Sequence, residues 1–137
     1  MLRSQRLLLR PAQSADVAPL ATILAEPKVA QFWQDFDAER VRKELVAPDP
    51  EDSLTVLIIE HEGAVIGAIQ FEENDDPQYR QAGIDLFIGS HFHGRGLGRE
   101  AIAAVVDHLF GVRGHHRITI DPAAHNLRAI HAYERVG

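Results

Sequence analysis

Three glycines occupy alternate positions in the stretch HFHGRGLGRE, residues 91–100, between two runs of different periodicity. The preceding run IDLFIG, residues 84–89, is rich in apolar and β-branched residues, which predicts a strand. The following run REAIAAVVDHLF, residues 99–110, repeats its apolar residues at helical spacing. Another strand is predicted at HRITIDP, residues 116–122. A strand, a helix and a strand in this order predict a βαβ unit with parallel strands.

The rest of the chain supplies further strands and helices around this unit. In chain order, the additional expected elements are a strand over 6–12, helices over 14–24 and 29–46, two hairpin strands over 54–60 and 65–73, and a last helix over 126–137. The chain of 137 residues contains no internal repeat, so we expect one domain of the mixed α+β class over residues 1–137.

The alternating glycines Gly94, Gly96 and Gly98 permit two interpretations. They could serve only to turn the chain through a tight corner. Alternatively, they could let an anion approach the free N–H groups at the start of the helix, where the helix dipole is favourable. Arg95 and Arg99 would add positive charge. The spacing fits neither a Walker loop nor the NAD-binding fingerprint, so we expect a diphosphate on a carrier other than NAD.

The balance of charge excludes some partners. The net charge of −6 argues against nucleic acid, because phosphate backbones are bound by clustered Lys and Arg. A cationic partner would fit this charge, and solubility alone would explain it equally well. The chain has no cysteine, which excludes disulfides, thiolate metal ligands and a cysteine nucleophile.

No membrane segment is predicted. The sequence has no apolar run near the roughly 18 residues of a membrane helix. Its start, Met1-Leu2-Arg3-Ser4, lacks the apolar core of a secretory signal. We therefore expect a cytoplasmic protein.

Two stretches carry a resemblance to a known family. HFHGRGLGREA resembles the signature loop of the GCN5-related N-acetyltransferase (GNAT) family, Gln/Arg-x-x-Gly-x-Gly/Ala, with Gly96 and Gly98 at the glycine positions. NLRAIHAYERVG resembles the second signature of that family, an asparagine followed by Ala-x-x-x-Tyr-x-x-x-Gly. The likeness extends from Leu7 to the end of the chain. Within the family, the segments GIDLFIGS and FEENDDP are most similar to those of aminoglycoside 6'-N-acetyltransferases.

The resemblance implies a fold and an activity. The GNAT fold is a central mixed, twisted sheet flanked by helices. The implied reaction moves an acetyl group from acetyl-CoA directly to a primary amine of a cationic small molecule, an aminoglycoside, without a metal. The family continues beyond the position of Gly137 with two more strands, so we expect the chain to be truncated there or completed by a partner. An early end would expose a sheet edge, which favours a homodimer.

The resemblance also implies roles for individual residues. Asp85 would accept the proton of the attacking amine, directly or through water, and Tyr133 would protonate the departing thiolate. The residues expected to bind the cofactor are Phe87 and Ile88, through main-chain pairing with pantetheine, His93, Gly94, Arg95, Gly96, Leu97, Gly98 and Arg99 in the loop, and Asn126. The residues expected to contact the acceptor are Trp33, Asp35, Glu72, Glu73 and Asp121.

Several of these residues have a plainer interpretation. Asp85 could be an edge-strand aspartate facing water, although an unpaired carboxylate within an apolar strand is costly. Glu72 and Glu73 could belong to a solvated loop, or to an acidic field that attracts a polyamine. Trp33 could simply fill the core. Asp121 could be no more than a strand exit before proline.

The histidines raise the question of a metal site. His91 and His93 stand two residues apart, but no third ligand follows at a recognisable spacing, so we expect no metal. His93 stands where the family has Gln or Arg. An imidazole can still donate to phosphate, and does so more strongly when it is protonated.

Two other functions compete with acetylation of an aminoglycoside. One is acetylation of a protein N-terminus, as in ribosomal-protein acetyltransferases, or of a polyamine. The other is a domain that binds acyl-CoA without catalysis. Specificity in this fold resides in loops, so the sequence leaves the acceptor open.

Overall fold

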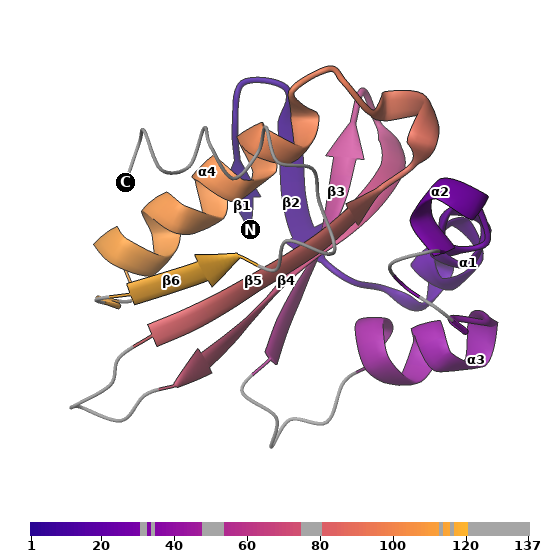
Figure 1. Ribbon diagram of the computed structural model, residues 1–137, viewed down its shortest axis with the longest axis horizontal. Coiled ribbons are helices and arrows are strands. Elements are labelled where there is room, and N and C mark those ends of the chain that lie inside the picture. Colours follow the sequence, from indigo (N-terminus) through magenta and orange to yellow (C-terminus); the bar gives the residue numbers. More distant parts are fainter. Residues whose placement is uncertain are drawn as a thin grey trace.

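A computed structural model describes residues 1–30, 33, 35–47, 54–74, 81–112, 114–115 and 117–120. In this part of the chain, six strands form one curled sheet in the order β1-β2-β3-β4-β5-β6 (Figure 1). The strands are β1 Leu2–Arg3, β2 Leu7–Pro11, β3 Leu54–His61, β4 Ala64–Asn74, β5 Gln81–Ile88 and β6 Arg117–Ile120. The α-helices are α1 Val17–Leu24, α2 Pro27–Ala30, α3 Ala38–Val41 and α4 Leu97–Gly111. Short 3-10 turns lie at Ser14–Asp16 (η1) and Ser90–Phe92 (η3), and a π-helical turn lies at Arg42–Val46 (η2).

The sheet is antiparallel from β1 through β5, and its last pair, β5 and β6, is parallel. Helix α4 makes the crossover between these two strands, as parallel neighbours require. The predicted βαβ unit and the mixed α+β class are therefore confirmed.

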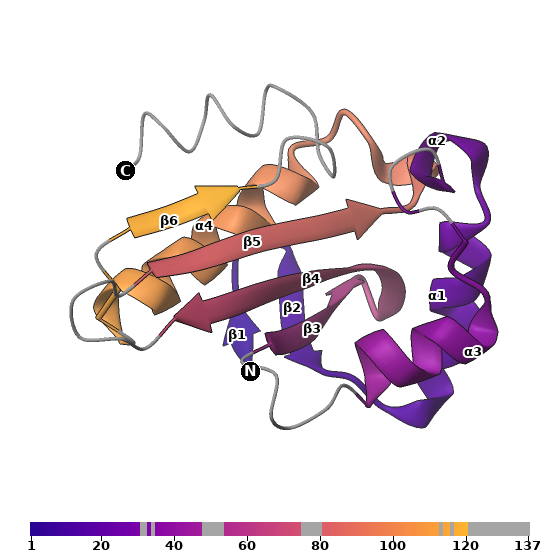
Figure 2. The same ribbon diagram turned by 60° about the horizontal axis from the view of Figure 1, so that its bottom comes forward.

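Alternate residues of the strands face two separate apolar layers. Leu57 and Ile59 of β3 pack in the cluster that contains α4, whereas Val56 and Ile58 pack in the cluster that contains α1 and α3. This alternation follows from the two-residue period of a strand. Figure 2 shows α4 along the sheet beside β5 and β6. It shows α1 to α3 grouped together at the end of the sheet toward which β5 points. The sheet is thus a central layer with helices on both faces.

The single helix expected over residues 29–46 is wrong. The described part of this segment forms α2, α3 and a π-helical turn. Asp35 adopts a left-handed φ of 62°, and Asp37 is extended and accepts the Arg40 N–H at 2.8 Å through its side chain. An aspartate at this position caps a new helix rather than continuing the old one, because its short carboxylate competes for backbone N–H groups. Helical spacing alone cannot reveal such a restart.

Two smaller features were not expected from the sequence. Pro27 begins a further short helix, α2, after α1 ends at Leu24, because the first turn of a helix tolerates a residue without an N–H. The short strand β1, Leu2–Arg3, pairs with β2 and was not expected from its sequence. The predicted hairpin of β3 and β4 is confirmed, with its turn at Glu62 and Gly63 in the left-handed region.

A partly buried ion pair joins β2 to the turn η1 that precedes α1. Both nitrogens of the Arg10 fork donate to Asp16 at 2.8 Å, and Arg10 Nε also bonds the Glu60 carboxylate of β3. Asp16 accepts the Gln13 N–H at 2.7 Å as well. The hydrogen bond from Arg10 outweighs the opposing effect of burial and holds the pKa of Asp16 below its ordinary value.

Replacing Asp16 with Asn should therefore make the free energy of unfolding less dependent on pH in the acidic range. At pH 7 we expect a loss of about 2–3 kcal/mol in the free energy of unfolding, because a buried charge loses its partner. The folded-state pKa is depressed, so the contribution is present above the ordinary pKa and is lost as pH falls through the folded pKa. Urea unfolding at pH 7 and pH 3, with Asp107→Asn as an exposed control, measures it. An equal loss at both pH values would contradict this assignment.

Candidate functional site

The glycine stretch leads from β5 into α4 through two residues whose backbone conformation only glycine adopts easily. Gly94 and Gly96 have φ values of 79° and 77°, in the left-handed region. Gly96 is the N-terminal cap of α4, and its carbonyl accepts the Glu100 N–H at 3.1 Å. The N–H groups before Glu100 have no acceptor within the helix. A Cβ at Gly94 would meet no atom within 4 Å, so space is open beside these donors. The geometry suits an anion.

His93 points back toward β5. Its Nε2 lies 2.6 Å from the carbonyl oxygen of Ile88, to which it donates. This bond closes the segment between the strand and the glycines. Nε2 is therefore engaged, and Nδ1 is the nitrogen that remains to meet a phosphate.

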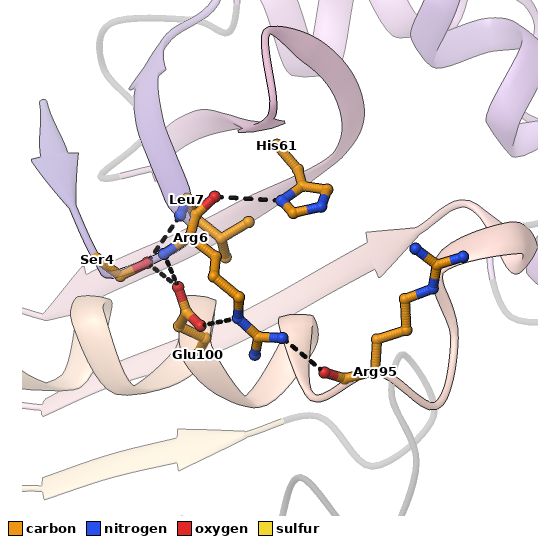
Figure 3. Close-up of polar contacts among 6 residues, drawn as sticks. All are labelled: Ser4, Arg6, Leu7, His61, Arg95 and Glu100. Carbon is orange, nitrogen blue, oxygen red and sulfur yellow. Dashed lines mark hydrogen bonds and ion pairs between the residues drawn. The ribbon is translucent and has the colours of Figure 1, made fainter.

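Two side chains from other elements hold the loop in place. Glu26, just after α1, accepts both the backbone N–H and the hydroxyl of Ser90, each at 2.7 Å. Arg6, just before β2, donates from Nη1 to the Arg95 carbonyl at 3.0 Å and from Nε to Glu100 at 2.7 Å (Figure 3). Sequence reasoning missed Glu26, Arg6 and Glu100. The one available signal was Glu100, an acid in the first turn of a helix whose start was expected to bind an anion.

Asp85 lies on the face of β5 that is covered by α1 to α3. Phe87, two residues further along the strand, shares this face and is packed among residues of those helices. Trp33 contacts Phe87 edge to face, with ring centroids 5.0 Å apart. One carboxylate oxygen of Asp85, Oδ1, is shielded from solvent. The fold thus brings Asp85 and the buried Trp33 to one side of the sheet.

The C-terminal half of β5 extends beyond the described part of β6. Pairing between the two strands runs from Gln81 opposite Arg117 to Ile84 opposite Ile120. On its other edge, β5 pairs with β4 as far as Ile88 opposite Gly67. Among the described residues, β5 therefore continues over 85–88 past the last residue that pairs with β6, and Figure 2 shows the β6 arrow ending partway along β5. This segment runs directly into the glycine loop.

The predicted acidic contacts separate in the structure. Glu72 is exposed on β4. The Glu73 carboxylate turns inward and binds His115 Nε2 at 2.7 Å, and the two side chains are 6% and 1% exposed. Glu73 is therefore engaged in a buried pair that joins β4 to the segment before β6. Asp35 is exposed at a left-handed position beside α3.

The remaining predicted residues divide into two groups. In the loop, Arg95 and Arg99 are exposed, Leu97 is buried under the first turn of α4, and Gly98 lets that turn lie against Ile88 and Leu86. Three residues, Asp121, Asn126 and Tyr133, lie outside the described residues.

The described part of the chain contains neither a metal-binding cluster nor a helix that could span a membrane. Among the described residues, no group of three or more His, Asp or Glu side chains could hold a metal ion. No helix in the described ranges is long and apolar enough to cross a bilayer.

Comparison with protein families and curated proteins adds independent findings. The family described as acetyltransferase (GNAT) domain matches residues 6–137. An aminoglycoside N(6')-acetyltransferase type 1 of Klebsiella pneumoniae is 30% identical over 146 residues, which covers 94% of this chain and 72% of that protein. A probable spermine N(1)-acetyltransferase of Bacillus subtilis subsp. natto is 29% identical over 82 residues, 56% of this chain and 54% of that protein.

Solved structures resemble this one closely in fold. The crystal structure of aminoglycoside acetyltransferase AAC(6')-Ib in complex with coenzyme A and kanamycin superposes with a TM-score of 0.77 and 27% sequence identity. The match covers 96% of this chain and 83% of that chain.

Proposed function

Because the chain belongs to the acetyltransferase (GNAT) domain family, whose match spans residues 6–137, it is an acyltransferase that uses acetyl-CoA, and we propose that its acceptor is a primary amine of an aminoglycoside. The observation that carries the proposal is the 85–88 segment of β5, which continues past its described pairing with β6 and leads into the left-handed glycines. Pantetheine can add to the edge of such a segment as if it were a strand, while the diphosphate meets the start of α4.

The residues present fit this donor. The N–H groups at the start of α4 and the open space at Gly94 suit a diphosphate, and Arg95 and Arg99 offer charge from the exposed side of the loop. The Ile88 carbonyl already accepts from His93, but a carbonyl oxygen has two lone pairs and can accept from pantetheine as well. On the strength of its motif, we assign Asn126 a hydrogen bond to the pantetheine or to the glycine loop.

The proposed chemistry is a direct transfer. The acceptor must lose a proton before its nitrogen can attack, and Asp85 takes that proton directly or through water. The nitrogen forms a bond to the acetyl carbon, the carbon–sulfur bond breaks, and the nitrogen, now part of the amide, releases its second proton to water, from which Tyr133 is later reprotonated. The departing thiolate takes a proton from Tyr133. Trp33, packed on Phe87, lines the side from which the amine arrives, and Asp35, Glu72 and Asp121 supply negative charge for a cationic acceptor.

A polyamine is a second candidate acceptor. The resemblance to a probable spermine N(1)-acetyltransferase favours it, although that match covers 56% of this chain. Both acceptor classes carry several ammonium groups, so a net charge of −6 suits either.

Release of free thiol from acetyl-CoA tests the acceptor class. Kanamycin should give the highest kcat/KM in a panel that also contains spermine, spermidine and a peptide with a free N-terminus. A higher value for spermine would transfer the assignment to polyamines. The enzyme proposal itself would fail if coenzyme A bound and no amine in the panel were acetylated.

A further inference from the structure

The N-terminal segment crosses the first turn of α4 and binds it through a compact polar network (Figure 3). The Glu100 carboxylate accepts from the Arg6 backbone N–H and from Arg6 Nε, both at 2.7 Å, and also from the Ser4 hydroxyl. Ser4 Oγ in turn accepts the Leu7 N–H at 3.2 Å, which fixes the start of β2. Arg6 then reaches past Glu100 to the Arg95 carbonyl.

We infer that Arg6 is a positioning residue for the diphosphate of coenzyme A, an inference that rests on the proposed function. Arg6 lies far from the glycine loop in sequence and was not among the expected site residues. It acts in two ways, one geometric and one electrostatic, on the cradle for the diphosphate, which we define as the loop over residues 94–96 and the first turn of α4.

The geometric effect passes through a single peptide group. The Arg95 carbonyl and the Gly96 N–H belong to the same planar trans peptide, so they point in opposite directions. When Arg6 Nη1 holds the carbonyl at 3.0 Å, the Gly96 N–H is directed away from Arg6. Gly96 has a left-handed φ, and because glycine has no Cβ, it restricts the orientation of this peptide less than another residue would. Arg6 therefore fixes the orientation of a donor at the start of α4.

The electrostatic effect concerns Glu100. Burial of this carboxylate favours its neutral form, but the hydrogen bonds from Ser4 and Arg6 outweigh burial and hold the pKa of Glu100 below its ordinary value. Glu100 is thus ionised in the first turn of α4, where a negative charge suits the helix dipole but repels an incoming diphosphate. The Arg6 guanidinium pairs with it and removes that repulsion.

The decisive comparison uses two acetyl donors. Arg6→Gln should raise the Kd for coenzyme A by about 30-fold and raise KM for acetyl-CoA in step, with kcat nearly unchanged. Its kcat/KM for S-acetylpantetheine, which lacks the diphosphate, should equal that of the wild type. Arg3→Gln is the matched control: it removes one positive charge from the exposed neighbouring strand β1, outside the network, and should leave both donors unaffected.

Glu100→Gln separates the two effects. In the Arg6→Gln background it should restore part of the affinity for coenzyme A, because the uncompensated charge is gone while the Arg95 carbonyl stays unbound. In the free protein, the amide resonance of Gly96 should shift on Arg6→Gln and stay in place on Arg3→Gln.

Three results would overturn the inference. Equal losses with acetyl-CoA and S-acetylpantetheine would mean that Arg6 only stabilises the fold. An unchanged Kd for coenzyme A in Arg6→Gln would remove Arg6 from the cradle while leaving the proposed function intact. A wild-type protein that binds no coenzyme A would overturn the proposed function itself, and this inference with it.

Discussion

Asp85→Asn should lower kcat by about 100-fold or more at neutral pH, because the acceptor amine loses the group that takes its proton. KM for acetyl-CoA should stay near the wild-type value, since the loop and the start of α4 are unaffected. The substitution keeps the shape of the side chain, so the thermal midpoint should change little. Initial rates of thiol release with kanamycin measure the effect.

The pH profile gives this prediction a second test. Without a carboxylate, the amine must be deprotonated by solvent before it attacks, so the kcat of Asp85→Asn should rise with pH across the range in which the amine becomes neutral. Asp107→Asn is the matched control, since Asp107 is exposed on α4. An Asp85→Asn enzyme with wild-type kcat at neutral pH would exclude Asp85 as the base.

Gly96→Val should raise the Kd for coenzyme A by about 100-fold. A φ of 77° is unfavourable for a β-branched residue, so the peptide must move or carry strain. The new Cβ would also lie 3.5 Å from Arg6 Nη2, which places the branched side chain against the network that holds the loop. Loss of two charge-assisted hydrogen bonds to the diphosphate accounts for about 3 kcal/mol, which corresponds to that change in affinity. Calorimetric titration with coenzyme A measures it.

Gly63→Val separates backbone strain from ligand binding. Gly63 lies in the turn between β3 and β4, has a φ of 79°, and has no atom within 4 Å of the position of a Cβ. Its substitution carries a similar backbone cost, but it should leave the Kd for coenzyme A unchanged. The role of Gly96 in binding coenzyme A would be contradicted if Gly96→Val folded and bound coenzyme A as tightly as Gly63→Val.

Much of the fold could be predicted because its signals are local. The β-branched runs on either side of Glu62-Gly63 predicted the hairpin, and the order strand, glycines, helix, strand predicted the parallel pair of β5 and β6. The segment over residues 29–46 was mispredicted because apolar spacing continues through it, while Asp37 restarts the helix through one side-chain hydrogen bond.

The candidate site was predictable only in part. The loop glycines were identified from their spacing, and the structure gives Gly94 and Gly96 the left-handed backbone that such a loop needs. The grouping of Glu72 with Glu73 could not be resolved, because neighbouring residues on a strand face opposite sides and only the fold shows which side is buried. Glu73 meets His115, which lies 42 residues further along the chain. The roles of Asp85, Asn126 and Tyr133 stay predictions.

The sequence by itself determined the features whose causes are local. These are the alternating apolar residues of the strands, the apolar face of α4, and the glycines that lead into the N-terminus of α4. Only the tertiary structure decided which distant side chains complete the loop. Arg6 and Glu26 meet Glu100 and Ser90 across 94 and 64 residues of sequence. A hydrogen bond acts over about 3 Å, so it depends on where the curled sheet and its crossover place two segments, and no local pattern records that placement.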